Sequence, residues 1–176
     1  MDERHENEQY FFDGPTLDRL AAFVCSFARP CCVCAPLLGR AVSRRGHSVR
    51  ILDIDERFAD TPGFLRWDLN RPIWLDEAFD LIVCDPPFFN VSLSRLFRAL
   101  RVLSQNRFDQ PVLISYPTRR GSNLMATFHR FGLQPSGYFP RYLTVQASER
   151  NTIEFYSNLG SDHLAALRGV EAVSLP

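Results

Sequence analysis

Short apolar runs alternate with amphipathic stretches along most of this 176-residue chain. The runs that resemble buried strands lie at residues 31–36, 47–55, 64–69, 78–84 and 111–116. The stretches with apolar residues at helical spacing lie at residues 15–28, 37–46, 93–103 and 120–132. Buried strands that alternate with helices predict a parallel sheet with helices on both faces. Two final β-rich stretches, 137–145 and 151–158, predict an antiparallel pair at the end of the sheet.

The length and composition fit a single folded domain. Hydrophobic residues make up 45% of the chain, which argues against a disordered protein. We expect a flexible N-terminus at residues 1–8, one domain at residues 9–160, and a tail at residues 161–176 that is loosely ordered or forms a short helix. No apolar run reaches membrane-spanning length, and the charged N-terminus has no signal-peptide core. Because the cysteines lie in apolar segments, we expect reduced thiols, a cytoplasmic location and no metal.

The charge of the chain narrows the choice of partners. Its 20 cations are all arginine and balance 20 carboxylates, so the chain is not basic overall, as many nucleic-acid binders are. Arginine is nevertheless well suited to phosphate contact. The candidates for a phosphate path beside a site are therefore Arg119, Arg120, Arg141 and Arg150, and ordinary surface arginines are the alternative.

Acidic residues stand where three of the predicted strands end. Asp53 and Asp55 end the second strand, Asp68 follows the third, and Asp85 follows the fourth. Ligands of open α/β sheets bind outside the carboxyl ends of the strands, where one carboxylate can accept both hydroxyls of a ribose. A carboxylate after the third strand can read an adenine edge. The structural alternatives are a helix cap at Asp55 and a turn cap at Asp68.

The turn after the first predicted strand restricts the cofactor. It contains Ala35, Pro36 and Leu37 and has no glycine-rich phosphate loop. This absence weakens NAD(P) and ATP as ligands. The remaining candidate is an adenosine cofactor without phosphates, and we expect S-adenosylmethionine.

The sequence DPPF, residues 85–88, ends the fourth strand in a stiff turn. Each proline fixes φ and removes a backbone donor, which exposes a carboxylate, free carbonyls and an aromatic ring. The Asp85 carboxylate and the Pro86 carbonyl can accept both N–H groups of adenine N6, and Phe88 can stack on the base. The same box could hold a lysine amine through cation–π contact with Phe88 and Phe89.

These motifs, in this order, resemble the probable N6-adenine methyltransferase family. The resemblance covers about residues 9–158 and is carried by QYFFDGPT, VCAP, ILDID, DPPF and IEFYSN. The sequence is most similar to the catalytic domain of zinc-finger ribosomal RNA adenine methyltransferases. A sister branch of the same family methylates a lysine of a translation elongation factor. The resemblance implies a Rossmann-like, class I S-adenosylmethionine-dependent methyltransferase of the α/β class. Its sheet would be mostly parallel and seven-stranded, with helices on both faces and a C-terminal antiparallel pair.

The resemblance also implies roles for residues at matching positions. Residues that would cover or hold the cofactor are Gln9, Tyr10, Phe11, Phe12, Ala35, Pro36, Asp53, Asp55, Asp68, Leu69 and Asp85. The implied catalytic residues are Asp85, Pro86, Pro87 and Phe88. Residues expected to bind the substrate are Phe88, Phe89, Asn90, Arg119, Arg141 and Arg150.

We therefore expect an N-methyltransferase that acts on adenine N6, foremost in structured RNA of the ribosomal type. A protein-lysine methyltransferase is the alternative, favoured by the zero net charge and the small size. Two further alternatives are a DNA adenine methyltransferase and a catalytically silent RNA-binding partner subunit. The chain lacks the zinc modules, so a partner protein could recruit the substrate. Leu37 stands where an arginine would follow the VCAP-type turn, so the resemblance assigns no group to the methionine carboxylate.

Overall fold

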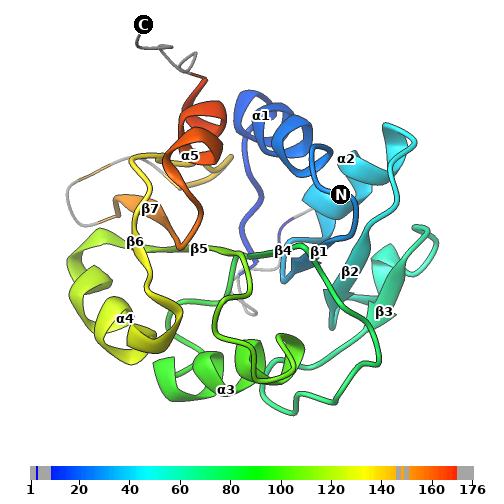
Figure 1. Ribbon diagram of the computed structural model, residues 1–176. Helices are drawn as coiled ribbons and strands as arrows, with labels where there is room; N and C mark the ends of the chain where they lie inside the picture. Colours follow the sequence, from blue (N-terminus) through cyan, green and yellow to red (C-terminus); the bar gives the residue numbers. More distant parts are fainter. Residues whose placement is uncertain (1–2, 4–8, 146–147, 149–150, 170–176) are drawn as a thin grey trace, which may run out of the picture.

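The computed structural model describes residue 3 and residues 9–145, 148 and 151–169. Within these residues, seven strands form one sheet in the order β3-β2-β1-β4-β5-β7-β6 (Figure 1). The strands are β1 (Pro30–Val33), β2 (Arg50–Asp53), β3 (Phe64–Arg66), β4 (Leu81–Cys84), β5 (Val112–Pro117), β6 (Gln134–Pro135) and β7 (Ile153–Ser157). The strands β1 to β5 run parallel, whereas β7 is antiparallel to both of its neighbours. The predicted mostly parallel sheet with a terminal antiparallel pair is confirmed.

Helices cover both faces of this sheet, as the alternating sequence pattern predicts. The helices are α1 (Gly14–Val24), α2 (Pro36–Arg44), α3 (Leu93–Leu103), α4 (Gly121–Thr127) and α5 (Ser161–Arg168). Short 3-10 turns lie at Glu56–Phe58, Thr118–Arg120 and His129–Phe131. Figure 1 shows α1, α2 and α5 on one face and α3 and α4 on the other. The Rossmann-like arrangement places the carboxyl ends of β1 to β5 along one edge.

The helix α3 shows how the sequence sets the faces of a helix. It begins after Ser92, whose hydroxyl accepts the backbone N–H of Arg95. Its apolar residues recur at helical spacing and are buried against the sheet; they are Leu96, Ala99, Leu100 and Leu103. Its arginines at positions 95, 98 and 101 lie on the exposed side.

The helix α2 approaches the sheet closely because it carries a glycine. A Cβ atom at Gly39 would lie 2.4 Å from the Cγ1 atom of Ile51 on β2. Only a residue without a side chain permits this approach. The contact brings the N-terminal end of α2 to the carboxyl edge of the sheet, beside the end of β1.

One strand of the terminal pair differs from its sequence prediction. The partner of β7 is the two-residue strand Gln134–Pro135, and residues 137–145 form no strand. Gly137 has a φ of 72°, in the left-handed region, and Pro140 has no N–H to donate. The chain therefore leaves the sheet at this point.

The segment that leaves the sheet pairs with the N-terminal segment instead. Tyr142 forms an isolated antiparallel bridge with Phe12, and the Leu143 N–H donates to the Phe11 carbonyl at 2.9 Å. The rings of Phe12 and Tyr142 lie 5.0 Å apart. This crossing carries Tyr142 to the carboxyl edge of the sheet.

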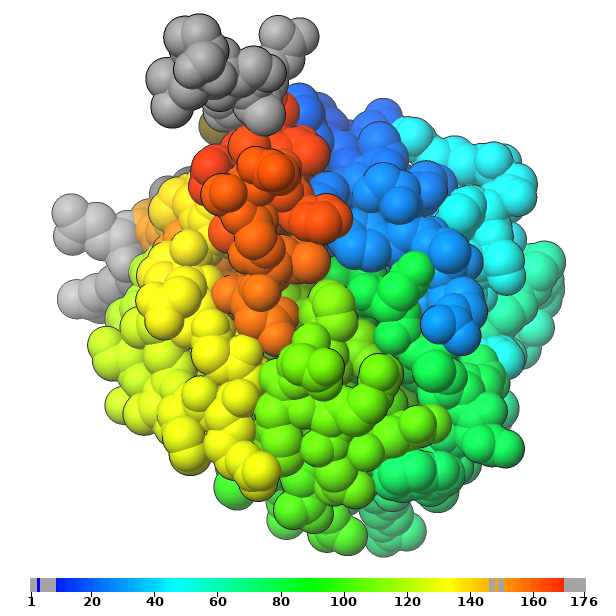
Figure 2. Space-filling view, viewed as in Figure 1, coloured from blue at the N-terminus to red at the C-terminus, as the bar shows by residue number. Residues whose placement is uncertain are grey.

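Part of the expected C-terminal tail packs onto the domain. Residues 161–168 form α5, which lies against α1 (Figure 2), with Leu167 fully buried. The rings of Phe27 and His163 stack at 5.4 Å across this contact. The expected flexible N-terminus, apart from Glu3, lies outside the described residues, as does the tail after residue 169. The domain boundaries stay a prediction.

The close approach of α2 to the sheet predicts the effect of a single methyl group. Gly39→Ala should destabilise the protein by about 1–3 kcal/mol, because the new methyl group overlaps Ile51. Gly14→Ala is the matched control, since a Cβ there meets no heavy atom within 4 Å. Thermal unfolding should show a lower Tm for Gly39→Ala alone. Equal Tm values for both variants would contradict the close approach.

Candidate active site

The carboxylate of Asp85 lies at the carboxyl edge of the sheet, directly after β4. Its backbone N–H donates to the Val33 carbonyl at 3.1 Å, which ties the turn to β1. Its Oδ1 atom accepts the Tyr142 hydroxyl at 2.7 Å and also the hydroxyl of Ser115, a buried residue of β5. Three segments distant in sequence thus fix one carboxylate in place.

The surroundings of this half-buried carboxylate change its protonation. Removal from water raises the pKa of Asp85 to about 7, although the hydrogen bonds from Ser115 and Tyr142 act in the opposite direction. Both donors engage Oδ1, and within the described part of the chain Oδ2 accepts no hydrogen bond. Burial and the nearby Asp85 charge raise the pKa of Tyr142 well above its usual value, so this hydroxyl remains a donor. The site therefore offers one unpaired carboxylate oxygen.

The residues after Asp85 form the predicted rigid turn. Phe88 is largely buried, packs edge-on against Tyr116 at 5.9 Å, and its carbonyl accepts a hydrogen bond from Arg120 at 3.0 Å. Phe89 is 63% exposed. Phe88 thus forms part of a supported wall, and Phe89 is the more accessible ring.

An aromatic cavity of about 470 Å³ opens beside this turn. Its lining residues are Tyr10, Phe88, Phe89, Pro117, Arg119, Tyr142, Thr144, Val145, Asn151 and Ile153. The guanidinium carbon of Arg119 lies 5.7 Å from the centre of the Phe89 ring. Three residues expected to bind substrate, Phe88, Phe89 and Arg119, meet here. The size is that of a small-ligand pocket.

A narrow cleft is lined by Asp85. Its lining includes seven of the residues expected around the cofactor: Gln9, Tyr10, Phe11, Phe12, Ala35, Pro36 and Asp85. Phe11 and Phe12 are buried and anchor the N-terminal segment, with the Phe11 ring 6.4 Å from that of Phe58. The cleft has a volume of only about 10 Å³, so the segment of residues 9–12 closes it. Tyr10 lines both the cleft and the aromatic cavity.

The two carboxylates at the end of β2 differ in their partners. Asp55 accepts hydrogen bonds from Arg57 at 2.6–3.2 Å and from the Gln9 side chain at 2.9 Å. Although burial opposes ionisation, these partners lower the pKa of Asp55 to about 2. Burial raises the pKa of Asp53 to about 6, and its Oδ1 accepts the Asp55 N–H at 2.8 Å. Within the described residues Asp53 accepts no hydrogen bond from a side chain, so it is the carboxylate more available to a ribose.

Several expected site residues lie elsewhere. Asp68 lines a separate hollow, and its Oδ1 accepts the Asn70 N–H at 2.8 Å, which is the turn cap considered as the alternative. Leu69 is buried. Asn90 and Arg141 are exposed and are not among the residues that line the aromatic cavity. Arg150 lies outside the described residues.

Two residues that bind Asp85, Ser115 and Tyr142, were not predicted from the sequence. Ile54, which stands between the two β2 carboxylates in sequence, is 49% exposed. Ser115 had a signal, because it is the polar residue in the apolar run VLISYP. Tyr142 had none, because its place depends on a crossing that the local sequence does not encode.

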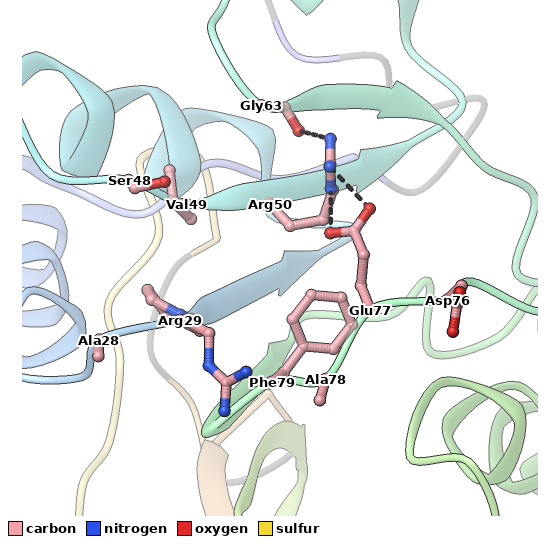
Figure 3. A pocket seen from close by; sticks show the side chains of 11 residues that line it. Ala28, Arg29, Ser48, Val49, Arg50, Gly63, Asp76, Glu77, Ala78 and Phe79 are labelled. Carbon is pink, nitrogen blue, oxygen red and sulfur yellow. Dashed lines mark hydrogen bonds and ion pairs between the residues drawn. The ribbon is translucent and has the colours of Figure 1, made fainter.

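A further hollow, of about 380 Å³, lies at the opposite edge of the sheet (Figure 3). Arg50 pairs there with Glu77 at 2.7 and 2.9 Å and donates to the Gly63 carbonyl at 3.1 Å. The exposed Arg29 lines the same hollow, just before β1. None of the expected site residues is among its lining residues. The amino ends of the strands are not where open α/β sheets bind their ligands.

Two other features bear on cofactors and location. No group of three or more His, Cys, Asp or Glu side chains in the described residues could hold a metal ion. All five cysteines are free thiols. Among the helices of the described residues, none has the length and apolar character needed to cross a membrane.

Comparison with solved structures supports the fold. Magnesium protoporphyrin IX methyltransferase from Synechocystis, with bound S-adenosylmethionine, aligns with a TM-score of 0.57 and 13% identity over 81% of this chain and 77% of that chain. A Pyrococcus horikoshii protein named for an inferred RNA methyltransferase activity aligns with a TM-score of 0.57 and 15% identity over 89% of both chains. The N-methyltransferase NodS from Bradyrhizobium japonicum aligns with a TM-score of 0.52 and 13% identity over 83% of this chain and 98% of that chain. At these identities the likeness shows a shared class I methyltransferase fold.

Comparison of sequences gives the family. No curated protein matches this chain. A family model described as probable N6-adenine methyltransferase matches residues 3–161, which include both the Asp85 turn and the Tyr142 crossing. The expected methyl donor, S-adenosylmethionine, fits this family and this fold. The protein is a methyltransferase and belongs to the probable N6-adenine methyltransferase family.

Proposed function

We propose that the protein transfers a methyl group from S-adenosylmethionine to N6 of an adenine in structured, ribosomal-type RNA. The observation that carries this proposal is that Asp85 lines the narrow cleft and accepts the hydroxyl of Tyr142, which lines the aromatic cavity. One oxygen of Asp85 is held by Ser115 and Tyr142, and the other is left for a substrate N–H group. The cytoplasmic location expected from the sequence suits both the RNA substrate and the free thiols.

The chain offers suitable groups for each part of the cofactor. Asp53 would accept the ribose hydroxyls, and the exposed side chain of Ile54 would offer an apolar surface to the adenine ring. The first turn of α2 has no side-chain cap, so its backbone N–H groups can receive the methionine carboxylate in place of an arginine at position 37. Asp68 and Leu69 stay predicted adenine contacts.

Cofactor entry requires movement of the N-terminal segment. The cleft has almost no free volume, and Gln9 bridges Asp55 at 2.9 Å and Arg57 at 2.7 Å. Release of these two hydrogen bonds would let residues 9–12 lift from the ends of β1 and β2. When they close again, Tyr10 would lie over both the cofactor and the aromatic cavity.

The residues around Asp85 suit methylation of a weakly nucleophilic amine. The bound cofactor supplies an electrophilic methyl group. Asp85 Oδ2 and the Pro86 carbonyl accept the two N–H groups of N6, which directs the nitrogen lone pair toward the cleft. As the C–N bond forms, nitrogen gains positive charge, and the Asp85 carboxylate stabilises that charge. With a pKa of about 7, Asp85 can also accept the proton that nitrogen releases.

The aromatic cavity favours a base over a lysine. Arg119 lines it, and no carboxylate is among the described residues of its lining. A cationic lysine would therefore meet a like charge at Arg119, whereas a nucleotide phosphate would be attracted. The rings of Phe88, Phe89 and Tyr142 offer stacking surfaces worth roughly 1–3 kcal/mol per base. Protein lysine remains the second candidate, because the same rings could bind an ammonium group.

Acceptor identity can be tested with the whole chain and labelled cofactor. Methyl groups from radiolabelled S-adenosylmethionine should enter an extract of unmodified cells, half of which is then treated with nuclease and half with protease. We expect nuclease to remove the labelled acceptor and digestion to nucleosides to yield N6-methyladenosine. Loss of the label with protease alone would instead identify a protein substrate.

Replacement of Asp85 should separate activity from stability. Asp85→Asn should abolish transfer and leave cofactor affinity within about threefold, because its amide oxygen can still accept from Ser115 and Tyr142 while its N–H₂ replaces the acceptor Oδ2. The raised pKa means that ionised Asp85 destabilises the fold: the stability contributed by its protonated form is fully present below about pH 4, where the carboxyl is also protonated in the unfolded chain, and is lost as the pH rises through about 7. The neutral variant should therefore have a higher Tm than the unmodified protein at pH 8, and a smaller difference at pH 5.

A matched control makes the Asp85 result specific. Asp109→Asn changes an exposed carboxylate in the loop before β5 and should alter neither transfer nor Tm at pH 8. Full transfer by Asp85→Asn would contradict the proposed mechanism. An unchanged or lower Tm of Asp85→Asn at pH 8 would contradict the claim that ionised Asp85 destabilises the fold.

The hydrogen bond from Tyr142 predicts a shift in the pH profile. Because Asp85 must be ionised to accept from N6, kcat/KM should rise with pH through about 7. Tyr142→Phe removes a hydrogen bond that lowers the pKa of Asp85, so the rise should move to higher pH. Tyr138→Phe, a change at a tyrosine that does not contact Asp85, should leave the profile in place. Identical profiles for both variants would show that Tyr142 does not act through Asp85.

A further inference from the structure

A second hollow, with arginine walls, lies on the same edge of the sheet as Asp85. It has a volume of about 450 Å³ and lies between the turn after β3 and the helix α3. Its lining residues are Asp68, Asn70, Arg71, Pro72, Arg95 and Arg98. We refer to it below as the basic hollow.

The arginines of the basic hollow are not engaged in ion pairs. Within the part of the chain that the structure describes, Arg71 and Arg98 are exposed, and neither guanidinium group has a hydrogen-bond or salt-bridge partner. Arg95 donates to the Asn70 side chain at 3.3 Å, a neutral partner that leaves its charge unbalanced. Asp68 is the single carboxylate in the described lining, so the hollow carries a net charge of about +2. Planar guanidinium groups held around one hollow suit phosphate oxygens.

The arginines of α3 form a row of positive charge along the exposed side of the helix. Arg95, Arg98 and Arg101 recur every three residues on its exposed side, so their guanidinium groups follow one face. Residues 90–92 are all that separate Phe89, in the wall of the aromatic cavity, from the start of α3. A polynucleotide strand with its target base in the cavity would therefore have a short path to the basic hollow.

An exposed aromatic side chain follows the wall of the hollow closely in sequence. Trp74 is 54% exposed, two residues after Pro72 in the wall of the hollow. The loop is held in place, because the indole N–H of the buried Trp67 donates to the Ile73 carbonyl at 3.3 Å. An exposed tryptophan next to arginines is the combination with which proteins bind single-stranded nucleic acid: phosphates contact the cations and bases stack on the ring.

We propose that the basic hollow and Trp74 form a second nucleic-acid contact, distinct from the cavity for the target base. Arg71, Arg95 and Arg98 bind phosphates of an unpaired RNA segment that flanks the target adenine, and Trp74 stacks on one of its bases. The proposal rests on the proposed function and adds the substrate class to which it applies, RNA with an unpaired strand next to the target. It also supplies a recognition surface within this chain.

The test measures binding by the full chain without cofactor. A short, fluorescently labelled single-stranded RNA is titrated at about 50 and 200 mM salt, and anisotropy gives Kd and its salt dependence. The variants are Arg71→Ala with Arg98→Ala in one chain, and Trp74→Ala in another. The matched controls are Arg29→Ala, an exposed arginine in the hollow at the opposite edge (Figure 3), and Phe139→Ala, an aromatic residue that is 52% exposed.

We expect the double arginine variant to bind RNA at least about tenfold more weakly and to lose about 1.4 from the log–log salt slope, since each single-strand phosphate contact contributes about 0.7. Trp74→Ala should weaken binding about fivefold or more with the slope unchanged. Both controls should bind like the unmodified chain, and all variants should keep its affinity for S-adenosylmethionine. A Kd for the double variant equal to that of the unmodified chain would overturn the proposal.

The outcomes also separate this proposal from the proposed function. Binding that requires the hollow, in a protein that transfers no methyl group to adenine, would support the surface and reject the activity. Adenine methylation together with RNA binding that does not depend on the hollow would support the activity and reject the surface. Poly-glutamate serves as an acidic polypeptide probe. If the arginine variant loses affinity for it as much as for RNA, and Trp74→Ala changes neither, the hollow binds acidic protein and the proposal is wrong.

Discussion

The structure depends on one half-buried carboxylate, that of Asp85. Ionised Asp85 is costly there, as its pKa of about 7 shows, and the hydrogen bonds from Ser115 and Tyr142 offset only part of that cost. These two donors come from β5 and from the segment that crosses to the N-terminal residues. The fold accepts this unfavourable group at the position where charge would develop during methyl transfer. Functional sites are where such local costs are expected.

The crossing that supplies Tyr142 also connects the two ligand spaces. Tyr142 pairs with Phe12, so the wall of the aromatic cavity is joined to the N-terminal segment over the narrow cleft. Tyr10 lines both spaces. Under the proposed function, opening the cleft for the cofactor would alter the wall of the aromatic cavity. This connection would then give a physical reason for ordered binding, in which the cofactor closes the segment before the acceptor base enters.

The sequence indicates the local parts of this arrangement and misses the distant ones. The apolar strands, the acidic residues at their ends and the DPPF turn are each encoded within a few neighbouring residues, and the structure has them where expected. The partners of Asp85 lie 30 and 57 residues away, so only the order of the strands brings them to it. Residues 137–145 have the aromatic content of a strand, but Gly137 and Pro140 break the ladder. The choice between Asp53 and Asp55 likewise depended on Arg57 and Gln9, whose contacts only the folded chain defines.

The most direct test of the role of Asp85 is the titration of its own carboxyl group. Carboxyl ¹³C NMR of the chain with labelled aspartate, with the Asp85 signal assigned by its absence from Asp85→Asn, gives the pKa of this one group. We predict that Asp85 titrates with a midpoint at about pH 7. A midpoint near the ordinary value of 3.8 would show that Asp85 is neither buried nor held as described, and the proposed role in methyl transfer would lose its physical basis.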